Sequence, residues 1–328
     1  METAIVVANA ENSVSVVGDT FDTGILAGGK SPNTIEQYRL HWTAYVAYAG
    51  TWEMAVQAAT LARWRQHLFV GGYTTKRGTQ KQYTVNAINL RLASVRSVIA
   101  AAAEQGYVDH ATAEAFKVVR GLKQKANKER KRENNRTPIT RDQMDDICNA
   151  PNVKTGAGLM HRAFLLTMRG TGARITDVVT MKVDDIAPYT NDSGVSGWAV
   201  KFQGKNETEP VFVEISATAK QAIDRWLKWR DLAGVQSEYV FTGFTGRGDR
   251  SPSGKPISRV SAWEMVQRYA KRVKLEHIKP HDFRRYVGTQ LAKKDIRLAQ
   301  KQLRHKRIET TAQNYVLDDV HMGHMDAI

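Results

Sequence analysis

The chain has 328 residues, 42% of them hydrophobic, which suits two globular domains with separate cores. Its 48 Lys and Arg residues outnumber its 33 Asp and Glu residues, and the resulting net charge of +15 attracts polyanions. Its apolar runs are too short to cross a membrane, and the N-terminus lacks the basic start and long apolar stretch of a signal peptide. Cys148 is the single cysteine, which excludes an intrachain disulfide and fits a reducing compartment.

The excess of positive charge favours nucleic acid as the partner. A generally basic soluble protein, or one that contacts anionic lipid, would show the same excess, so the motifs must decide between these classes. Charge alone favours DNA or RNA over a membrane as the partner, and the single cysteine fits a cytoplasmic protein.

Residues 30–122 are predicted to form a small all-helical domain behind a weakly ordered arm of residues 1–29. Ser31 and Pro32 are typical of a helix start, and Gly50 ends that helix. Further helices are expected over about 56–69, 84–99 and 111–119, with a polar loop at 73–82. The helix expected over 84–99 has one apolar face at helical spacing, made by Val85, Ile88, Leu92, Val95 and Ile99.

Residues 123–139 are predicted to be a basic linker, because the segment has almost no apolar side chains with which to build a core. It is either a solvated, charged helix end or a strap along a phosphate backbone. Under the second interpretation, six side chains are candidates for DNA contact: Lys123, Lys125, Lys128, Arg130, Lys131 and Arg132.

Residues 140–328 are predicted to form an α+β domain, mostly helical with one small antiparallel sheet. Residues 198–202 and 211–215 alternate apolar and polar side chains, as a half-buried hairpin does. A short extended piece is expected at 238–241 and a loop at 251–256. The other elements are helices, expected over 141–150, 159–168, directly after Gly172, and over 217–232, 260–273, 281–292, 298–303 and 310–315.

The most specific local motif is the segment 280–285, Pro-His-Asp-Phe-Arg-Arg. Helical spacing places His281 and Arg284 on one face, and Pro280 suits a helix start. Free backbone N–H groups and the helix dipole favour an anion at such a start. The pair therefore suits a phosphate clamp, although surface His/Arg pairs are common.

Other polar residues extend this motif in both directions along the chain. Arg174 follows a glycine-marked turn, Lys205 lies on the hairpin turn, and His305 and Tyr315 come after the motif. The ordered set Arg, Lys, His-x-x-Arg, His and Tyr resembles the signature of the tyrosine recombinase (phage integrase) family over residues 140–317. Four positions of the helical domain resemble that family's core-binding domain, less specifically: Thr34, Tyr38, Asn86 and Leu90.

The resemblance implies a mostly α, two-domain clamp around duplex DNA and site-specific recombination through a covalent 3′-phosphotyrosyl intermediate. It implies a homotetramer on a double-stranded recombination site and chemistry that needs no metal or cofactor. The catalytic residues that it implies are Arg174, Lys205, His281, Arg284, His305 and Tyr315, with Tyr315 as the nucleophile. It also implies that Asp177 orients a catalytic residue without contacting the substrate.

Each implied role suits its side chain. Arg174 and Arg284 would donate to the non-bridging oxygens of a pentavalent phosphate, and Lys205 would protonate the departing 5′ oxygen. The two histidines would hydrogen-bond the phosphate and shuttle protons. Asp177, one turn after Arg174, would orient that arginine or a histidine.

Two features depart from the family pattern. Arg304 stands where the family usually has glycine, and would add charge near the phosphate or contact DNA. The spacing from His305 to Tyr315 is one residue longer than expected, which puts Asn314 in the expected register. On a regular helix one residue is a rotation of about 100°, so a bulge in the connection would have to absorb it.

Two other functions stay open on the sequence. A type IB topoisomerase would use the same chemistry as a monomer, although the core-binding resemblance disfavours it. The chain could also be a non-catalytic DNA-binding protein on a recombinase scaffold, because the spacing from His305 to Tyr315 is one residue longer than the family pattern. His321 and His324, in the tail, are more typical of an irregular terminus than of a metal site.

Overall fold

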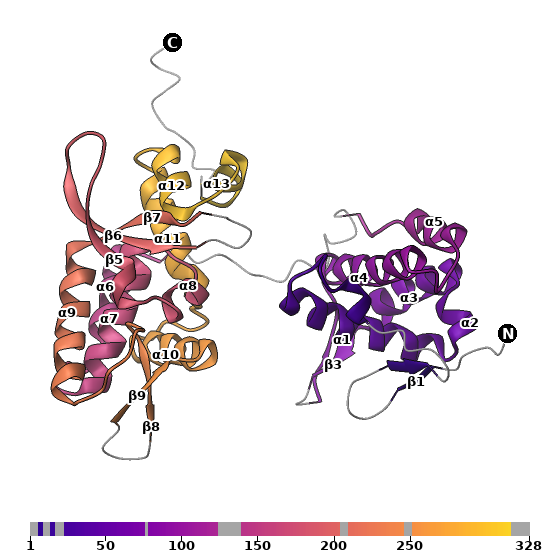
Figure 1. Ribbon diagram of the computed structural model, residues 1–328, viewed down its shortest axis with the longest axis horizontal. Coiled ribbons are helices and arrows are strands. Elements are labelled where there is room, and N and C mark those ends of the chain that lie inside the picture. Colours follow the sequence, from indigo (N-terminus) through magenta and orange to yellow (C-terminus); the bar gives the residue numbers. More distant parts are fainter. Residues whose placement is uncertain are drawn as a thin grey trace, which may run out of the picture. The chain divides into compact units, whose positions relative to one another are not determined.

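The computed structural model describes residues 6–8, 14–16, 23–75, 78–123, 139–203, 209–245 and 251–315. The chain divides into two compact units, Met1–Asn135 and Arg136–Ile328 (Figure 1). The predicted mostly helical architecture of two domains is confirmed. The sequence-based boundaries at residues 29, 122 and 139 are finer than this division and stay predictions.

The N-terminal unit is built from helices with short strand pairs between them. Its helices are α1 (Pro32–Ala49), α2 (Trp52–Ala55), α3 (Ala58–Gly71), α4 (Val85–Glu104), α5 (His110–Val118) and the 3-10 helix η1 (Thr23–Leu26). Two antiparallel pairs join β1 (Val6–Ala8) to β2 (Val14–Val16) and β3 (Tyr73–Thr74) to β4 (Gln80–Lys81).

Local sequence signals set the helix starts here. Ser31 is the N-cap of α1 with Pro32 at its first position, and the Thr84 hydroxyl accepts a hydrogen bond from the Ala87 N–H at the start of α4. The predicted apolar face of α4 is fully buried, from Val85 to Ile99. This face forms the core with side chains of α1, α3 and α5.

The structure differs from the sequence-based outline at two places in this unit. Leu26 is buried in the core, and the Gln105 side chain donates to the Ile25 carbonyl at 3.1 Å, so η1 packs as part of the unit although it falls within the expected arm. The expected loop at 73–82 contains the β3–β4 pair. One turn of helix and two-residue strands are too short to show a period.

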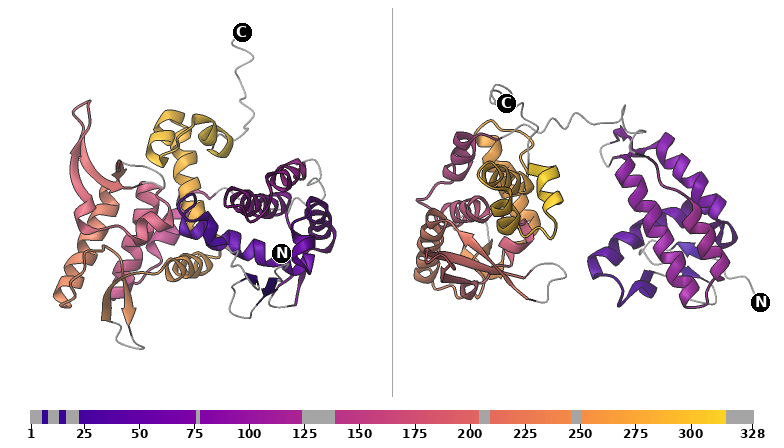
Figure 2. Two further views of the ribbon diagram at one scale, coloured as in Figure 1. Left: turned by 45° about the vertical axis from the view of Figure 1, so that its right-hand side comes forward. Right: turned by 90° about the horizontal axis from the view of Figure 1, so that it is seen from above.

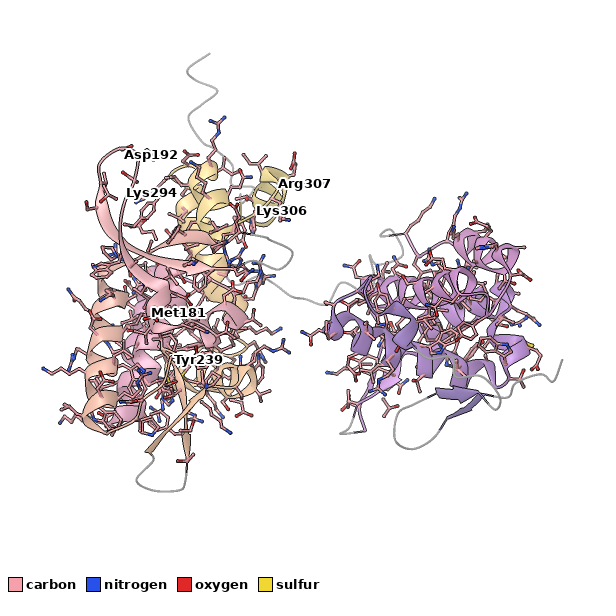
Figure 3. All side chains as sticks on the ribbon, viewed as in Figure 1. Met181, Asp192, Tyr239, Lys294, Lys306 and Arg307 are labelled. Atoms are coloured by element: carbon pink, nitrogen blue, oxygen red, sulfur yellow. The ribbon has the colours of Figure 1, made fainter. Side chains whose placement is uncertain are left out.

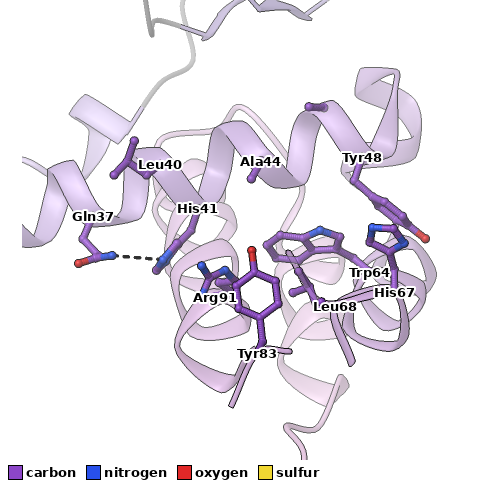
Figure 4. Close-up of a pocket in the computed structure, with 12 residues that line it drawn as sticks. Gln37, Leu40, His41, Ala44, Tyr48, Trp64, His67, Leu68, Tyr83 and Arg91 are labelled. Carbon is purple, nitrogen blue, oxygen red and sulfur yellow. Dashed lines mark hydrogen bonds between the residues drawn. The ribbon is translucent and has the colours of Figure 1, made fainter. Parts of the chain in front are cut away.

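A pocket of about 490 Å³ in the N-terminal unit lies among α1, α3 and α4 (Figure 4). Inside it, the buried His41 shares hydrogen bonds with Ser94 at 2.7 Å and Gln37 at 3.3 Å. Burial, and then the neighbouring Arg91, lower the pKa of His41 to about 4, so its imidazole is neutral at neutral pH. The Arg91 guanidinium stacks on the Tyr83 ring at 4.2 Å. The hydrogen bond between His41 and Ser94 ties α1 to α4.

The C-terminal unit combines eight α-helices with antiparallel strands in its described part. The helices are α6 (Arg141–Asn149), α7 (Gly156–Thr171), α8 (Ile175–Val179), α9 (Ala217–Leu232), α10 (Arg259–Arg272), α11 (Pro280–Ala292), α12 (Ile296–Leu303) and α13 (Ile308–Tyr315), with the 3-10 helix η3 (Val183–Asp185). Among the described residues of the chain, no helix combines the length and apolar character needed to cross a membrane.

The strands form one three-stranded sheet and one hairpin. The sheet has the order β5-β6-β7, with β5 (Ile186–Thr190), β6 (Ser196–Phe202) and β7 (Val211–Ile215). The hairpin pairs β8 (Thr242–Thr245) with β9 (Ser251–Pro256), so the loop expected at 251–256 is a strand. Its Ser, Pro, Gly and Lys residues are poor strand formers, and pairing with β8 overrides that preference.

The buried helix α7 lies in the core of this unit. Phe164 on α7 meets Phe241 edge to face, with ring centroids 5.1 Å apart, and Trp226 on α9 donates to the Val240 carbonyl at 2.7 Å. Helices α9 and α11 pack against α7. In Figures 1 and 2, α12 and α13 lie at the end of the unit opposite the β8–β9 hairpin.

Candidate active site

Five of the six predicted catalytic residues lie in described segments, and their elements meet where α7 ends. Arg174 is the N-cap of α8, shortly after Gly172 ends α7 in the left-handed conformation. His281 and Arg284 lie in the first turns of α11, His305 follows α12, and Tyr315 is the last residue of α13. Helix α11 contacts α7, α12 and α13, so these segments come together around it.

Arg284 lies at the centre of this arrangement. It is buried, and its guanidinium donates to the Gly172 carbonyl at 2.9 Å and to the Leu303 carbonyl. Burial, followed by repulsion from Arg174, lowers its pKa to about 10, and interactions with Tyr315 oppose that shift. Arg284 therefore stays charged at neutral pH and ties both neighbouring segments to α11.

Both predicted histidines are neutral at neutral pH in the free protein. Burial and then the positive charges of Arg284 and Arg174 lower the pKa of His305 to about 4. The pKa of His281 is also lowered, first by burial and then by the positive charge of Arg285. The His305 Nδ1 atom shares a hydrogen bond of 2.9 Å with the Thr311 hydroxyl, which fixes the ring.

Tyr315 reaches the site despite the longer spacing. Its ring stacks on the His305 ring, with centroids 5.5 Å apart and planes within 15°. Arg304 ends α12 with a φ of 53°, and α13 begins at Ile308, so the short connection reorients the chain before the last helix. The side chain of Asn314, which holds the expected register, is outside the described residues.

Tyr315 is also buried, with 3% of its surface exposed. It packs against Val287 and Leu303, and a Cβ at Gly288 would lie only 2.5 Å from its ring. Gly288 thus leaves on α11 the space that the tyrosine ring fills.

Asp177 and Arg304 form an ion pair with each other. The sequence suggested Arg174 or a histidine as the partner of Asp177, and charge near the phosphate or a DNA contact as the role of Arg304. The Arg304 side chain is 2% exposed, so in this conformation it faces the protein interior.

Gln302 is a contact residue that the sequence did not indicate. Its side-chain amide donates to the Thr171 carbonyl at 3.0 Å and to the Glu214 carbonyl at 2.8 Å. It thereby connects α12 to the end of α7 and to strand β7. A glutamine on a short basic helix gives no signal of such a contact.

Lys205 and most of the linker candidates lie outside the described residues. Strands β6 and β7, which flank Lys205, are paired through Phe202 and Val211, as the predicted hairpin requires. Of the six linker candidates, Lys123 is described and exposed, whereas the other five are not described: Lys125, Lys128, Arg130, Lys131 and Arg132. Within the described segments no group of three or more His, Cys, Asp or Glu side chains could hold a metal ion.

The family model "Phage integrase family" matches residues 138–321, more than half of the chain. The chain belongs to the phage integrase family. It is 31% identical over 174 residues to tyrosine recombinase XerD of Chlamydia trachomatis, a match that covers 51% of this chain and 52% of the relative. The match to XerD of Listeria monocytogenes is 24% identical over 298 residues and covers 88% and 89% of the two chains. The chain thus spans about half the length of the first of these relatives.

Solved structures share the fold of this family member. XerH recombinase bound to a palindromic difH substrate, in a post-cleavage complex, aligns with a TM-score of 0.64 at 16% identity and covers 90% of this chain and 79% of that one. A lambda integrase dimer bound to a COC′ core site aligns with a TM-score of 0.60 at 16% identity, covering 91% and 94%.

Because Gly288 contacts Tyr315, replacing this glycine with alanine should destabilise the protein, whereas the same replacement in a helix normally stabilises it. Alanine normally favours a helix interior over glycine by roughly 1 kcal/mol. In Gly288→Ala, however, the new methyl group would displace the Tyr315 ring, and we expect a loss of about 1–3 kcal/mol of stability. Thermal unfolding measures this loss. Gly71→Ala on α3 is the matched control, since its Cβ would lie 3.8 Å from the nearest atom, and equal stability of the two variants would contradict the packing described.

Proposed function

We propose that the chain is a site-specific DNA recombinase that cleaves and rejoins strands of duplex DNA through a covalent 3′-phosphotyrosyl intermediate at Tyr315. The observation that carries this proposal is that Tyr315, His305 and Arg284 lie together in one site. Arg174 is close enough for its charge to lower the pKa of both Arg284 and His305. Membership of the phage integrase family supports it, as do relatives named tyrosine recombinase XerD.

The two arginines would stabilise the transition state in different ways. Arg174 is exposed at a helix N-terminus, so its guanidinium would donate directly to the non-bridging oxygens of the phosphate. Arg284 already donates to two backbone carbonyls, so it would act mainly as a fixed positive charge beneath the phosphate. Such fixed charges need no reorganisation as negative charge develops.

The proton transfers follow from the protonation states of the free site. A neutral imidazole can accept a proton, so His305, whose ring stacks on that of Tyr315, would take the phenol proton as the tyrosine oxygen attacks phosphorus. The bond from phosphorus to the 5′ oxygen breaks, and Lys205 would supply the proton to that oxygen. Rejoining runs the same steps in reverse with a new 5′ hydroxyl.

Access to Tyr315 has to increase before it can attack DNA. The ring is almost fully buried in the free protein, so α13 or its neighbours must shift when DNA enters. We further propose that the protein acts as a homotetramer on duplex DNA in the bacterial cytoplasm, with the basic segment 123–139 following the phosphate backbone.

A covalent-capture experiment tests the proposed reaction without knowledge of the DNA site. The protein is mixed with a library of nicked duplexes that carry a randomised segment, and DNA that stays with the protein on a denaturing gel is recovered and sequenced. We expect an adduct enriched in a defined sequence for the wild type and none for Tyr315→Phe, which should bind the enriched DNA within a few-fold.

Tyr286→Phe is the matched control, because Tyr286 is the preceding tyrosine in the chain. An adduct in Tyr315→Phe would reject the assigned nucleophile. Sequence-specific binding with no adduct would indicate a non-catalytic DNA-binding protein, and an adduct with relaxation but no strand exchange would indicate a topoisomerase.

Lys205 as the general acid gives a second prediction. A 5′ oxygen leaves as a high-pKa alkoxide and needs a proton, whereas sulfur at that position leaves as a stable thiolate. Lys205→Ala should therefore cleave an ordinary phosphodiester very slowly but a 5′-bridging phosphorothioate at nearly the wild-type rate. Lys201→Ala, on strand β6, is the control; rescue of this variant instead of Lys205→Ala would reassign the acid.

A further inference from the structure

Arg304 and Asp177 connect two segments that are 127 residues apart in the sequence and lie beside predicted catalytic residues. Asp177 is in the first turn of α8, three residues after Arg174. Arg304 is the last residue before His305. The side chain of Asp177 is 15% exposed and that of Arg304 is 2% exposed, so the ion pair is largely shielded from water.

The ion pair is a weak source of stability. Arg304 adopts a φ of 53°, a left-handed conformation that is unfavourable for residues other than glycine. Its Nη1 atom is buried and has no hydrogen-bond partner among the described residues, and burying a charge carries a desolvation cost. Contact with the Phe202 ring, 5.0 Å from the guanidinium carbon, offsets only part of that cost.

Two other side chains connect the same segments at a different point. Arg284 donates to the carbonyls of Gly172 and Leu303, and Gln302 donates to the Thr171 carbonyl. These contacts fix the backbone just before Arg174. The Arg304–Asp177 pair fixes the helix just after Arg174, so Arg174 lies between two attachments to the segment that carries His305.

We propose that Arg304 is a positioning residue, which acts through Asp177 to hold Arg174 and His305 in fixed relation to each other during strand cleavage. This inference rests on the proposed recombinase function. Without the ion pair, Arg174 and His305 keep their chemistry but lose their relative orientation. DNA should then bind almost normally while the chemical step slows, because misplacement by about 1 Å can cost up to about 100-fold in rate.

The test combines three substitutions at the pair. Arg304→Gly removes the side chain and tolerates the positive φ, Asp177→Asn removes the charge at nearly constant shape, and Arg304→Lys retains a cation. We expect the first two to slow single-turnover cleavage at saturating DNA by about tenfold or more, with DNA affinity within about threefold. The double variant should be no slower than the slower single variant, because both remove one interaction. Arg304→Lys should recover part of the rate.

Lys306→Ala is the matched control, because Lys306 directly follows His305 in the sequence and its side chain is exposed. Figure 3 labels Lys306. Its cleavage rate at saturating DNA should equal that of the wild type. If Arg304→Gly fails to fold, as thermal unfolding would show, Asp177→Asn and Arg304→Lys carry the same comparison.

A readout that needs no catalysis separates this inference from the proposed function. The imidazole signals are titrated by NMR, and His305→Gln assigns the signal of His305. Burial and the nearby arginines hold its pKa at about 4, so release of Arg174 and entry of water in Arg304→Gly should raise that pKa, whereas Lys306→Ala should leave it unchanged.

The outcomes distinguish the two hypotheses. Wild-type cleavage and an unchanged His305 titration in Arg304→Gly would overturn the positioning role, as would rate losses that multiply in the double variant. A shifted titration in Arg304→Gly, combined with no adduct from the wild type, would support the positioning role and reject the recombinase function.

Discussion

The buried guanidinium of Arg284 is the constraint on which the candidate site depends. Removing a cation from water is unfavourable, and the lowered pKa of about 10 reflects that burial together with repulsion from Arg174. The carbonyls of Gly172 and Leu303 offset the cost, and they belong to segments 112 and 19 residues away from Arg284. The two hydrogen bonds donated by the Arg284 guanidinium therefore hold the end of α7 and the end of α12 against α11. Arg174 and His305 follow those two segments directly and are placed by the same contacts.

The charges gathered in this way prepare the site for an anion. Arg174 and Arg304 both lie close enough to Arg284 to lower its pKa, and the charges of Arg174 and Arg284 contribute to lowering the pKa of both histidines. A phosphodiester entering the site would relieve the mutual repulsion, so part of the cost of assembling the cations is recovered when the anion binds. The chain belongs to the phage integrase family, and the five predicted catalytic residues in the described segments lie on elements that meet where α7 ends.

Local chemistry made much of the fold predictable. Short stretches of sequence were enough to predict the cap at Ser31, the apolar face of α4 and the alternating strands β6 and β7. The structure contains all three. The pair His281 and Arg284 was recognised by helical spacing, whereas the roles of the wider set came from family resemblance. Three features left no local signal: the burial of Leu26, the bridge made by Gln302, and the strand β9, which pairs with the neighbouring strand β8 although its residues are poor strand formers. The position of Tyr315 belongs with them, because a short connection after Arg304 compensates for the extra residue.

In the proposed reaction, the free energy of the broken phosphodiester is retained in a covalent bond between phosphorus and the oxygen of Tyr315. Mass spectrometry of the captured adduct tests this most directly, after nuclease and protease digestion reduce it to a peptide that carries a short nucleotide. We expect a peptide containing Tyr315 with the nucleotide joined through its 3′ phosphate, so that the other cleaved end bears a free 5′ hydroxyl. A nucleotide joined through its 5′ phosphate, or one attached to any other residue, would contradict it.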